Sequence, residues 1–384
     1  MAKLAERMEG ISQMVVGDMV DLIAPLYATA IRMNTIHMLP SLMLWGPPGV
    51  GKSDSFKAIA KELKTLTGKI VNIIDVRLLL FNPVDLRGIP VADIDEITKQ
   101  KVAKWLKPLI FQMSADPNVV NILILDEISA APPSVQAAAY QITLDRTIGE
   151  HKLPDNCFIV AAGNRLTDKS VAYKMPKALA NRLCHIEIGC EVEDWKRWAV
   201  PHGIDSRIVA FLSFKPTLLF DFDPNSDTVA FPTPRSWQMV NEYLKYGTID
   251  DVMPLINGVI GSGAAIEFKA YSKVFGQLPD IDAILEGKEK TVPTKLDVLF
   301  AVSSSISSKI AADIADLDGK ITSRNIPQKT KTKIANALTY SMAFPPEYAT
   351  LLVKDLISLK LTDVLAQLPE WLQWSTKNAQ YLSN

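Results

Sequence analysis

The sequence is poor in cysteine and histidine, with three and four of them among 384 residues. Cys157, Cys184 and Cys190 form no C-x-x-C pair, so we expect neither a disulfide framework nor a structural zinc site. No stretch reaches the roughly 18 uninterrupted apolar residues of a membrane helix. The first ten residues contain acids and lack the apolar core of a signal peptide. These absences predict a protein of the reducing cytoplasm that does not enter a membrane.

An excess of charge of either sign is also missing. Lysine and arginine together number 41 and aspartate and glutamate 42, which gives a net charge of −1. Because a general binder of polyanions carries a basic excess, any affinity for nucleic acid has to be local.

Short apolar runs alternate with helix-like patterns in the first half of the chain. The strand-like runs are residues 42–45, 71–76, 122–125, 158–163 and 185–188. Their alternation with helices predicts an α/β fold with a parallel sheet flanked by helices. After about residue 190 the strand signals stop, and helical patterns continue around an Asp/Pro-rich loop at 221–234. We therefore expect an α/β domain over residues 1–190 and a helical part over residues 191–384.

The segment GPPGVGKS matches G-x-x-x-x-G-K-[ST] and lies between a predicted strand and a predicted helix. Glycines let the backbone wrap a phosphate, and the helix N-terminus adds positive potential there. In this motif Lys52 reaches the β- and γ-phosphates and the Ser53 hydroxyl binds Mg²⁺. The bland alternative is a glycine turn that happens to contain Lys and Ser. The predicted nucleotide-binding residues are Gly46, Pro47, Pro48, Gly49, Val50, Gly51, Lys52, Ser53 and Asp54.

Asp126 and Glu127 directly follow the apolar run 122–125, although an unpaired buried charge is very costly. Ligands of a parallel sheet bind outside the carboxyl ends of its strands, so the two acids are expected beside Lys52 and Ser53. Asp126 would then help to hold Mg²⁺ through water, and Glu127 would orient or deprotonate the attacking water. The alternative is a strand that ends in a solvated acidic loop.

Two further polar residues fit the same site. Asn164 follows the strand-like run 158–163, and its amide can bond both a water and a phosphate oxygen; a plain turn residue is the alternative. Thr233 and Pro234 suit the start of a helix, where the dipole opposes the cation of Arg235 by about 0.3–1 kcal/mol. A nearby anion would remove that conflict, whereas an exposed Arg235 would be screened by water.

Together these motifs resemble the AAA+ ATPases, specifically the MoxR branch of the helix-2-insert group, over about residues 15–245. GPPGVGKS resembles the Walker A motif, LILDEI the Walker B motif and AAGN sensor 1, which favours ATP over GTP. The resemblance implies a P-loop AAA+ core followed by an all-α lid and a helical C-terminal extension. MVVGDMVDLI departs from the adenine-contacting segment of the family, which would fall at Val16 and Gly17.

By this resemblance Glu127 is the catalytic base and Asn164 the water sensor. Arg182 in MPKALANRL corresponds to the arginine finger that enters the site of a neighbouring subunit, and Arg235 to the sensor-2 arginine of the lid. An exposed arginine at a helix end is the alternative for Arg182. The other candidates for the finger are Arg146 and Arg165.

Two hairpins are expected at residues 88–105 and 146–156, which in the family face the central pore of a ring. The first is expected to be basic because of four lysines, Lys99, Lys101, Lys104 and Lys107.

As a whole, the resemblance implies a homo-oligomeric, hexameric ring that uses ATP and Mg²⁺ for chaperone-like remodelling or assembly of a partner complex. Such ATPases often act with a von Willebrand factor A-domain protein. A nucleic-acid-translocating motor or phage-defence ATPase is the alternative, and a nucleotide-gated scaffold with little turnover is a third.

Overall fold

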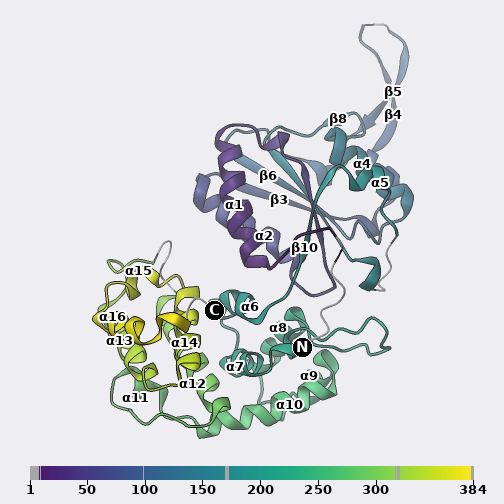
Figure 1. Ribbon diagram of the computed structural model, residues 1–384. Helices are drawn as coiled ribbons and strands as arrows, with labels where there is room; N and C mark the ends of the chain where they lie inside the picture. Colours follow the sequence, from purple (N-terminus) through teal and green to yellow (C-terminus); the bar gives the residue numbers. More distant parts are fainter. Residues whose placement is uncertain are drawn as a thin grey trace. The chain divides into compact units, whose positions relative to one another are not determined.

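The computed structural model of the protein describes residues 8, 10–97, 99–168, 173–315, 317 and 321–381 (Figure 1). Within them the chain forms two compact units. The α/β unit takes the residues up to Gly189 together with the short segment Asp223–Ser226. The helical unit takes Cys190–Phe222 and the described residues from Asp227 onward.

Within the described residues, six parallel strands form the central sheet in the order β1-β10-β2-β9-β6-β3. Their bounds are β1 (Gln13–Met14), β2 (Ser41–Trp45), β3 (Ile70–Arg77), β6 (Val119–Asp126), β9 (Cys157–Gly163) and β10 (Leu183–Ile188). The five predicted strands are therefore confirmed. The sequence analysis missed β1, because a two-residue strand leaves no periodic pattern.

The inner strands β2 and β9 are buried along their whole length, as expected for a parallel sheet covered on both faces. Strand β9 lies between β2 and β6, and the register pairs Trp45 with Gly163 and Leu125 with Ala161. The carboxyl ends of these three strands therefore meet at one edge of the sheet.

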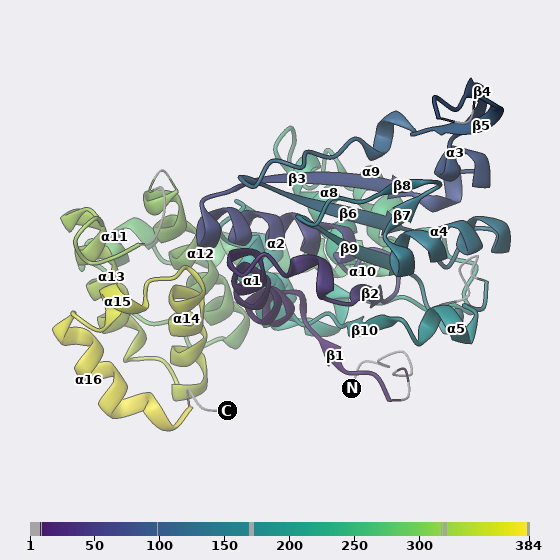
Figure 2. The same ribbon diagram turned by 90° about the horizontal axis from the view of Figure 1, so that it is seen from above.

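Helices cover the sheet, and α1 and α2 lie side by side (Figures 1 and 2). The helices of this unit are α1 (Val16–Arg32), α2 (Lys52–Thr67), α3 (Pro83–Arg87), α4 (Pro133–Asp145) and α5 (Lys177–Ala180), with 3₁₀ turns at Ile36–Met38, Leu78–Leu80, Leu109–Phe111 and Leu166–Asp168. On α2 the residues Phe56, Ile59 and Leu63 are almost completely buried. Each contributes about 1.5–3 kcal/mol by burial, which anchors the helix that follows the glycine-rich loop.

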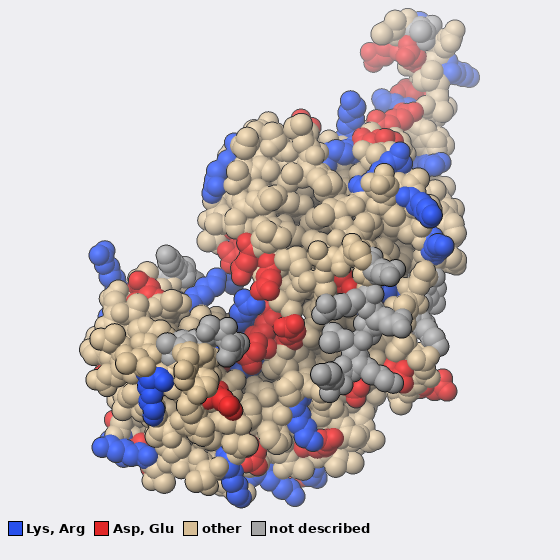
Figure 3. Space-filling model, in the orientation of Figure 1, with Lys and Arg blue, Asp and Glu red and all other residues tan. Residues whose placement is uncertain are grey.

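Both expected hairpins are present, as β4 (Ile89–Ile94) with β5 (Lys101–Leu106) and as β7 (Thr147–Ile148) with β8 (His151–Lys152). The β4–β5 hairpin projects away from the rest of the α/β unit (Figures 1 and 2). Acidic side chains lie among the lysines of this hairpin (Figure 3). Lys104 pairs with Asp93 at 3.4 Å, so the two signs partly neutralise each other.

The helical unit is built around one hydrophobic core that runs from Val192 to Trp374. Its helices are α6 (Val192–Ala199), α7 (Ser206–Phe214), α8 (Pro234–Leu244), α9 (Met253–Ile260), α10 (Ser262–Ser272), α11 (Ile281–Leu285), α12 (Leu296–Ile314), α13 (Gln328–Ser341), α14 (Pro346–Ser358), α15 (Thr362–Leu365) and α16 (Pro369–Asn378), with 3₁₀ turns at Pro216–Leu219, Lys273–Gln277 and Ala379–Tyr381. Among the described residues no helix combines the length and apolar character needed to cross a membrane.

A buried ion pair joins the first helix of this unit to one near its end. Lys196 Nζ on α6 lies 2.6 Å from Asp355 Oδ1 on α14, and both side chains are at most 3% exposed. Ser307 on α12 donates a hydrogen bond to the second carboxylate oxygen at 3.3 Å. The helices next to the α/β unit in sequence and the C-terminal helices therefore share one core and one polar contact inside it.

Candidate functional site

The glycine-rich loop connects the buried strand β2 to helix α2. Gly49 and Gly51 have φ angles of 81° and 96°, in the left-handed region that favours glycine. Gly51 is also the N-cap of α2, so the loop ends where the free N–H groups of the helix begin. Val50 is buried and holds the loop against the unit. The loop therefore presents backbone N–H groups and a helix N-terminus to one point, as a phosphate requires.

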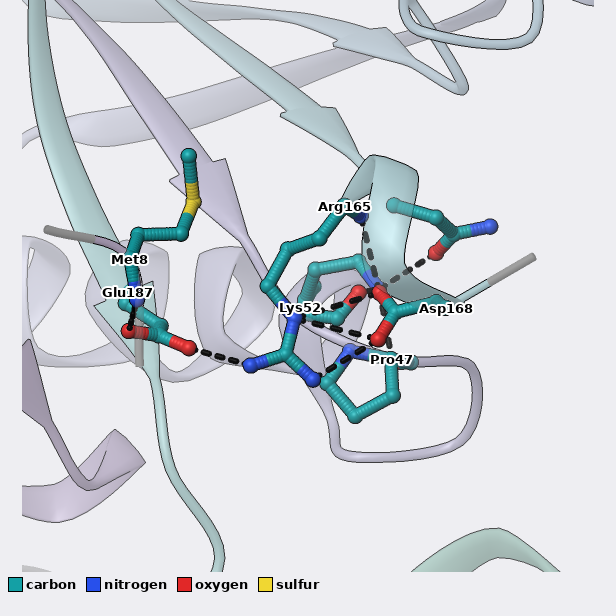
Figure 4. A network of polar contacts seen from close by, with 8 residues as sticks. Met8, Pro47, Lys52, Arg165, Asp168 and Glu187 are labelled. Carbon is teal, nitrogen blue, oxygen red and sulfur yellow. Dashed lines mark hydrogen bonds and ion pairs between the residues drawn. The ribbon is translucent and has the colours of Figure 1, made fainter. Parts of the chain in front are cut away.

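The ammonium group of Lys52 lies inside this loop (Figure 4). Its Nζ donates hydrogen bonds to the carbonyl oxygens of Gly46 at 2.6 Å and Pro47 at 2.9 Å. It also donates to Oδ1 of Asn164 at 2.9 Å, which brings together the ends of β2 and β9. A phosphate oxygen bound to Lys52 would therefore lie within reach of the Asn164 amide.

The carboxylate of Asp126 is buried at the end of β6 and has two hydrogen-bond donors. Ser53 Oγ donates to its Oδ2 at 2.8 Å, and the backbone N–H of Glu127 donates to its Oδ1 at 2.8 Å. A hydroxyl beside a carboxylate fits Mg²⁺, which takes one or two protein oxygens and completes its shell with phosphates and water. Among the described residues no group of three or more His, Cys, Asp and Glu could hold a metal, and this kind of site needs none.

Glu127 has a left-handed backbone with φ of 56°, which is uncommon for a residue other than glycine. Hydrogen bonds on both sides of it maintain this conformation: Asp126 accepts its N–H, and Ile128 N donates to Ala162 O at 3.0 Å. The side chain is half-buried. Strain of this kind persists where the surroundings enforce it and points to a function for the side chain.

Ser129 is a member of the site that the sequence analysis missed. Its buried hydroxyl accepts a hydrogen bond from the backbone N–H of Asn164 at 2.9 Å. A Cβ on Gly163 would lie 2.8 Å from that hydroxyl oxygen, so the small residue at the end of β9 allows the contact. No motif marks this serine, because its partner lies on another strand.

Asp75 on β3 was also missed. Burial and, after it, the negative charge of Asp126 raise the pKa of its carboxyl, and the cations Arg77 and Lys57 oppose the shift. Asp75 and Asp126 therefore repel each other electrostatically, which a cation bound near them would relieve.

The three candidate arginine fingers differ in accessibility. Arg182 follows α5 and is exposed, with its guanidinium 5.6 Å from the centre of the Tyr140 ring. Arg146 is half-buried and donates to the carbonyl oxygen of Cys157 at 2.5 Å. Arg165 is 4% exposed and forms ion pairs inside the α/β unit. Of the three, Arg182 is the exposed one.

The side chains of two other predicted residues are exposed. Arg235 is in the helical unit, exposed in the first turn of α8, whose N-cap Thr233 accepts a hydrogen bond from Ser236 N at 3.0 Å. Asp54 is exposed on α2, and its carboxylate pairs with Lys57 at 2.9 Å. Only the backbone of Asp54 can therefore belong to the phosphate-binding loop.

The N-terminal segment reaches the glycine-rich loop. The Cγ2 methyl of Val16 would lie 3.7 Å from a Cβ added to Gly51. Val16, the first residue of α1, is thus beside the glycine-rich loop, and Gly17 follows it.

Comparison with known proteins gives this site a family context. Residues 41–185 match the model of a family described as "ATPase family associated with various cellular activities (AAA)". The matched segment begins with β2 and ends in β10. The α/β unit accordingly has the P-loop AAA+ fold, followed by the helical unit, and the matched segment is an ATPase domain of the AAA type.

A curated relative is replication factor C subunit 4 of Caenorhabditis elegans, 32% identical over 108 residues. The match covers 28% of this chain and 29% of that protein, so the chain spans less than a third of the length of this relative.

Similar solved structures include a mutant of Thermotoga maritima RuvB, 14% identical, with 76% of this chain and 83% of that chain covered and a TM-score of 0.38. Another is the Aeropyrum pernix ORC1 protein in complex with DNA, 12% identical, with 90% and 83% covered and a TM-score of 0.36. Both similarities are too distant to inform on function.

Proposed function

We propose that this chain, with its AAA-type ATPase domain at residues 41–185, binds ATP with Mg²⁺ and hydrolyses it as one subunit of a homo-oligomeric, hexameric ring. The observation that carries the proposal is the meeting of four side chains from three strand ends. Lys52 contacts Asn164, and Ser53 contacts Asp126, at distances of 2.9 Å and 2.8 Å. Cation, amide, hydroxyl and carboxylate are the groups that a Mg²⁺-bound triphosphate needs.

Each side chain has one role in this proposal. Lys52 binds the β- and γ-phosphates, while Ser53 and Asp126 hold Mg²⁺, which would bridge phosphate oxygens and neutralise their charge. Glu127 accepts the proton of the attacking water, and Asn164 orients that water and a γ-phosphate oxygen. The left-handed backbone of Glu127 supports this role, because strain of this kind clusters at functional sites.

The last positive charge comes from a neighbouring subunit in this proposal. An arginine finger is worth about 10³–10⁵ in kcat, or roughly 4–7 kcal/mol. The exposed guanidinium of Arg182 suits such a contact, whereas those of Arg146 and Arg165 are engaged within their own unit. Arg235 would act from the helical unit as the sensor-2 arginine.

The purpose of turnover is proposed from the MoxR-like motifs: chaperone-like remodelling or assembly of a partner complex in the cytoplasm, with a von Willebrand factor A-domain protein as a candidate partner. The projecting β4–β5 hairpin offers a contact surface for a client. A nucleic-acid motor is less well supported, because the net charge is −1 and the hairpin carries both signs of charge.

Two variants test the core of the proposal. Lys52→Ala should lose ATP binding, while Glu127→Gln should retain bound ATP and lose hydrolysis by about 10²–10⁴-fold, the usual contribution of a general base. Lys57→Ala is the matched control, because this exposed lysine on the same helix contacts Asp54. Normal ATP affinity in Lys52→Ala, or normal turnover in Glu127→Gln, would refute the proposal.

A further inference from the structure

We propose that Arg165, Asp168 and Glu187 form a buried ionic network that positions Asn164 for ATP hydrolysis. The inference rests on the proposed ATPase function and adds residues that do not themselves touch the nucleotide. It also assigns Arg165 to its own subunit, and so removes it from the candidates for an arginine finger.

Figure 4 shows the network together with Lys52 and Pro47 of the glycine-rich loop. Arg165 Nε and Nη2 donate to Asp168 Oδ1 at 3.0 Å and 2.7 Å, and Nη1 donates to Glu187 Oε1. The second oxygen of Glu187 accepts the backbone N–H of Met8 at 3.0 Å. All three charged side chains are at most 4% exposed.

Burying three charged side chains opposes folding. Removing each charged group from water costs several kcal/mol, and apolar residues of similar size often stabilise a fold equally well or better. Burial alone lowers the pKa of the Arg165 guanidinium, but the hydrogen bonds and charges of Asp168 and Glu187 reverse this shift. The guanidinium therefore stays charged. The planar guanidinium fixes the positions of the groups around it, since its N–H donors fit carboxylates in few orientations.

The geometry it sets is that of Asn164. The backbone N–H of Arg165 donates to Asp168 Oδ2 at 2.8 Å, and the preceding N–H, that of Asn164, donates to Ser129 Oγ at 2.9 Å. Both peptide groups that flank the Asn164 side chain are thus tied to buried acceptors. The amide is left with its Oδ1 2.9 Å from Lys52 Nζ. A displacement of about 1 Å at such a position can cost about 10²-fold in rate.

Glu187 connects this network to other parts of the site. It lies on β10, where its register partner is Trp45, the last residue of β2 before the glycine-rich loop. Its contact with Met8 adds the N-terminal segment, whose Val16 lies near Gly51. The carboxylate of Glu187 therefore joins Arg165 to Met8, while its backbone pairs beside the end of β2.

Two isosteric variants, Asp168→Asn and Glu187→Gln, test the inference in the full-length protein. Each replaces a carboxylate by an amide of the same shape and so weakens the hydrogen bonds to the Arg165 guanidinium. We expect kcat to fall by about 10–100-fold with nearly unchanged affinity for ATP, since the loop itself is intact. Arg165→Lys should lower kcat as well, because an ammonium group lacks the planar set of N–H donors with which a guanidinium binds two carboxylates.

The decisive measurement repeats both variants in an Asn164→Ala background. If the network acts through Asn164, Asp168→Asn and Glu187→Gln cause no further loss of kcat there. Asp355→Asn is the matched control: it disrupts an equally buried ion pair in the helical unit, and its effect on kcat should be the same in both backgrounds.

Each other outcome has a definite meaning. A further loss in the Asn164→Ala background, equal to the loss in the wild type, would show a general structural role and overturn the inference. Full activity of Asn164→Ala would also overturn the inference. The proposed ATPase function would then still stand, provided that Glu127→Gln loses turnover. Normal turnover in Glu127→Gln would instead reject the function itself.

Discussion

Lys52 Nζ and Asn164 Oδ1 lie 2.9 Å apart, although 112 residues separate them in the chain. The parallel register of β2 and β9 explains the contact, because Trp45 pairs with Gly163 and each strand ends beside the other. The loop after β2 and the first residue after β9 therefore share one edge of the sheet.

Replacing Glu127 by Asn should separate strain from function. Asn adopts the left-handed region more readily than Glu, and the penalty at φ of 56° is on the order of 1 kcal/mol. We expect Glu127→Asn to have a higher thermal midpoint than the wild type and no measurable ATP turnover. Glu127→Gln should lose turnover without that gain. Equal midpoints for the two variants would show that the backbone is not strained here.

Adding a methyl group at Gly163 should damage both stability and turnover. The new Cβ would lie 2.8 Å from Ser129 Oγ and 3.0 Å from Met43 Cε. We expect Gly163→Ala to lower the free energy of unfolding by about 1–3 kcal/mol, as overpacking does, and to reduce kcat because Ser129 releases Asn164.

Gly258→Ala is the control for this substitution. A Cβ at that position in α9 would meet nothing within 4 Å. Alanine should therefore stabilise the helix by about 0.5–1 kcal/mol and leave turnover unchanged. Thermal melting and a steady-state ATPase assay measure both effects. Gly163→Ala with the stability and kcat of the wild type would contradict the predicted crowding.

Arg182 should act on a neighbouring subunit. Arg182→Ala alone and Glu127→Gln alone should each be inactive, but a mixture should regain ATPase activity. In mixed rings an intact Glu127 site of one subunit meets an intact Arg182 of the other. Mixed assemblies that stay inactive would place Arg182 outside the reaction.

Arg146→Ala should instead mainly lower stability, because the Arg146 guanidinium donates to the carbonyl oxygen of Cys157.

The three thiols should differ sharply in reactivity. Burial raises the pKa of Cys157 to about 11, and burial with the nearby charges of Asp194 and Glu191 raises that of Cys190 to about 12. The thiolate is the reactive form, so at pH 8 only about one Cys157 in a thousand is reactive, and the fraction rises with pH. Exposed Cys184 should therefore be alkylated first at pH 8, as read by mass spectrometry of peptides. Equal labelling of all three in the native protein would contradict this burial pattern.

Much of the fold could be predicted because its signals are local. The apolar runs of β2 and β6 and the face formed by Phe56, Ile59 and Leu63 appear in consecutive sequence. The bounds of helix α13 are harder to predict, because polar residues fill its first half and tertiary packing of residues such as Ile334 and Leu338 supplies its stability.

The glycine-rich loop, Asp126 and Glu127 could be recognised from the residue types and spacing alone, since phosphate and metal chemistry restricts both. Ser129, Asp75 and the partners of Arg165 could not. Ser129 and Glu187 act through contacts with distant parts of the chain, and a linear pattern contains no record of which distant oxygen will meet a given N–H. Sequence alone also could not show that Arg165 and Arg146 are engaged within their own unit while Arg182 is exposed.

The amino-acid sequence by itself determined the kind of chemistry: two acids and an amide directly after apolar runs, and a lysine and a hydroxyl at the end of a glycine-rich loop. Only the tertiary structure decided which of these groups touch one another and which charges are removed from water. The physical reason is that hydrogen bonds and ion pairs act over about 3 Å in space. Strand order and register determine which side chains come within that distance, and both depend on the packing of the whole unit.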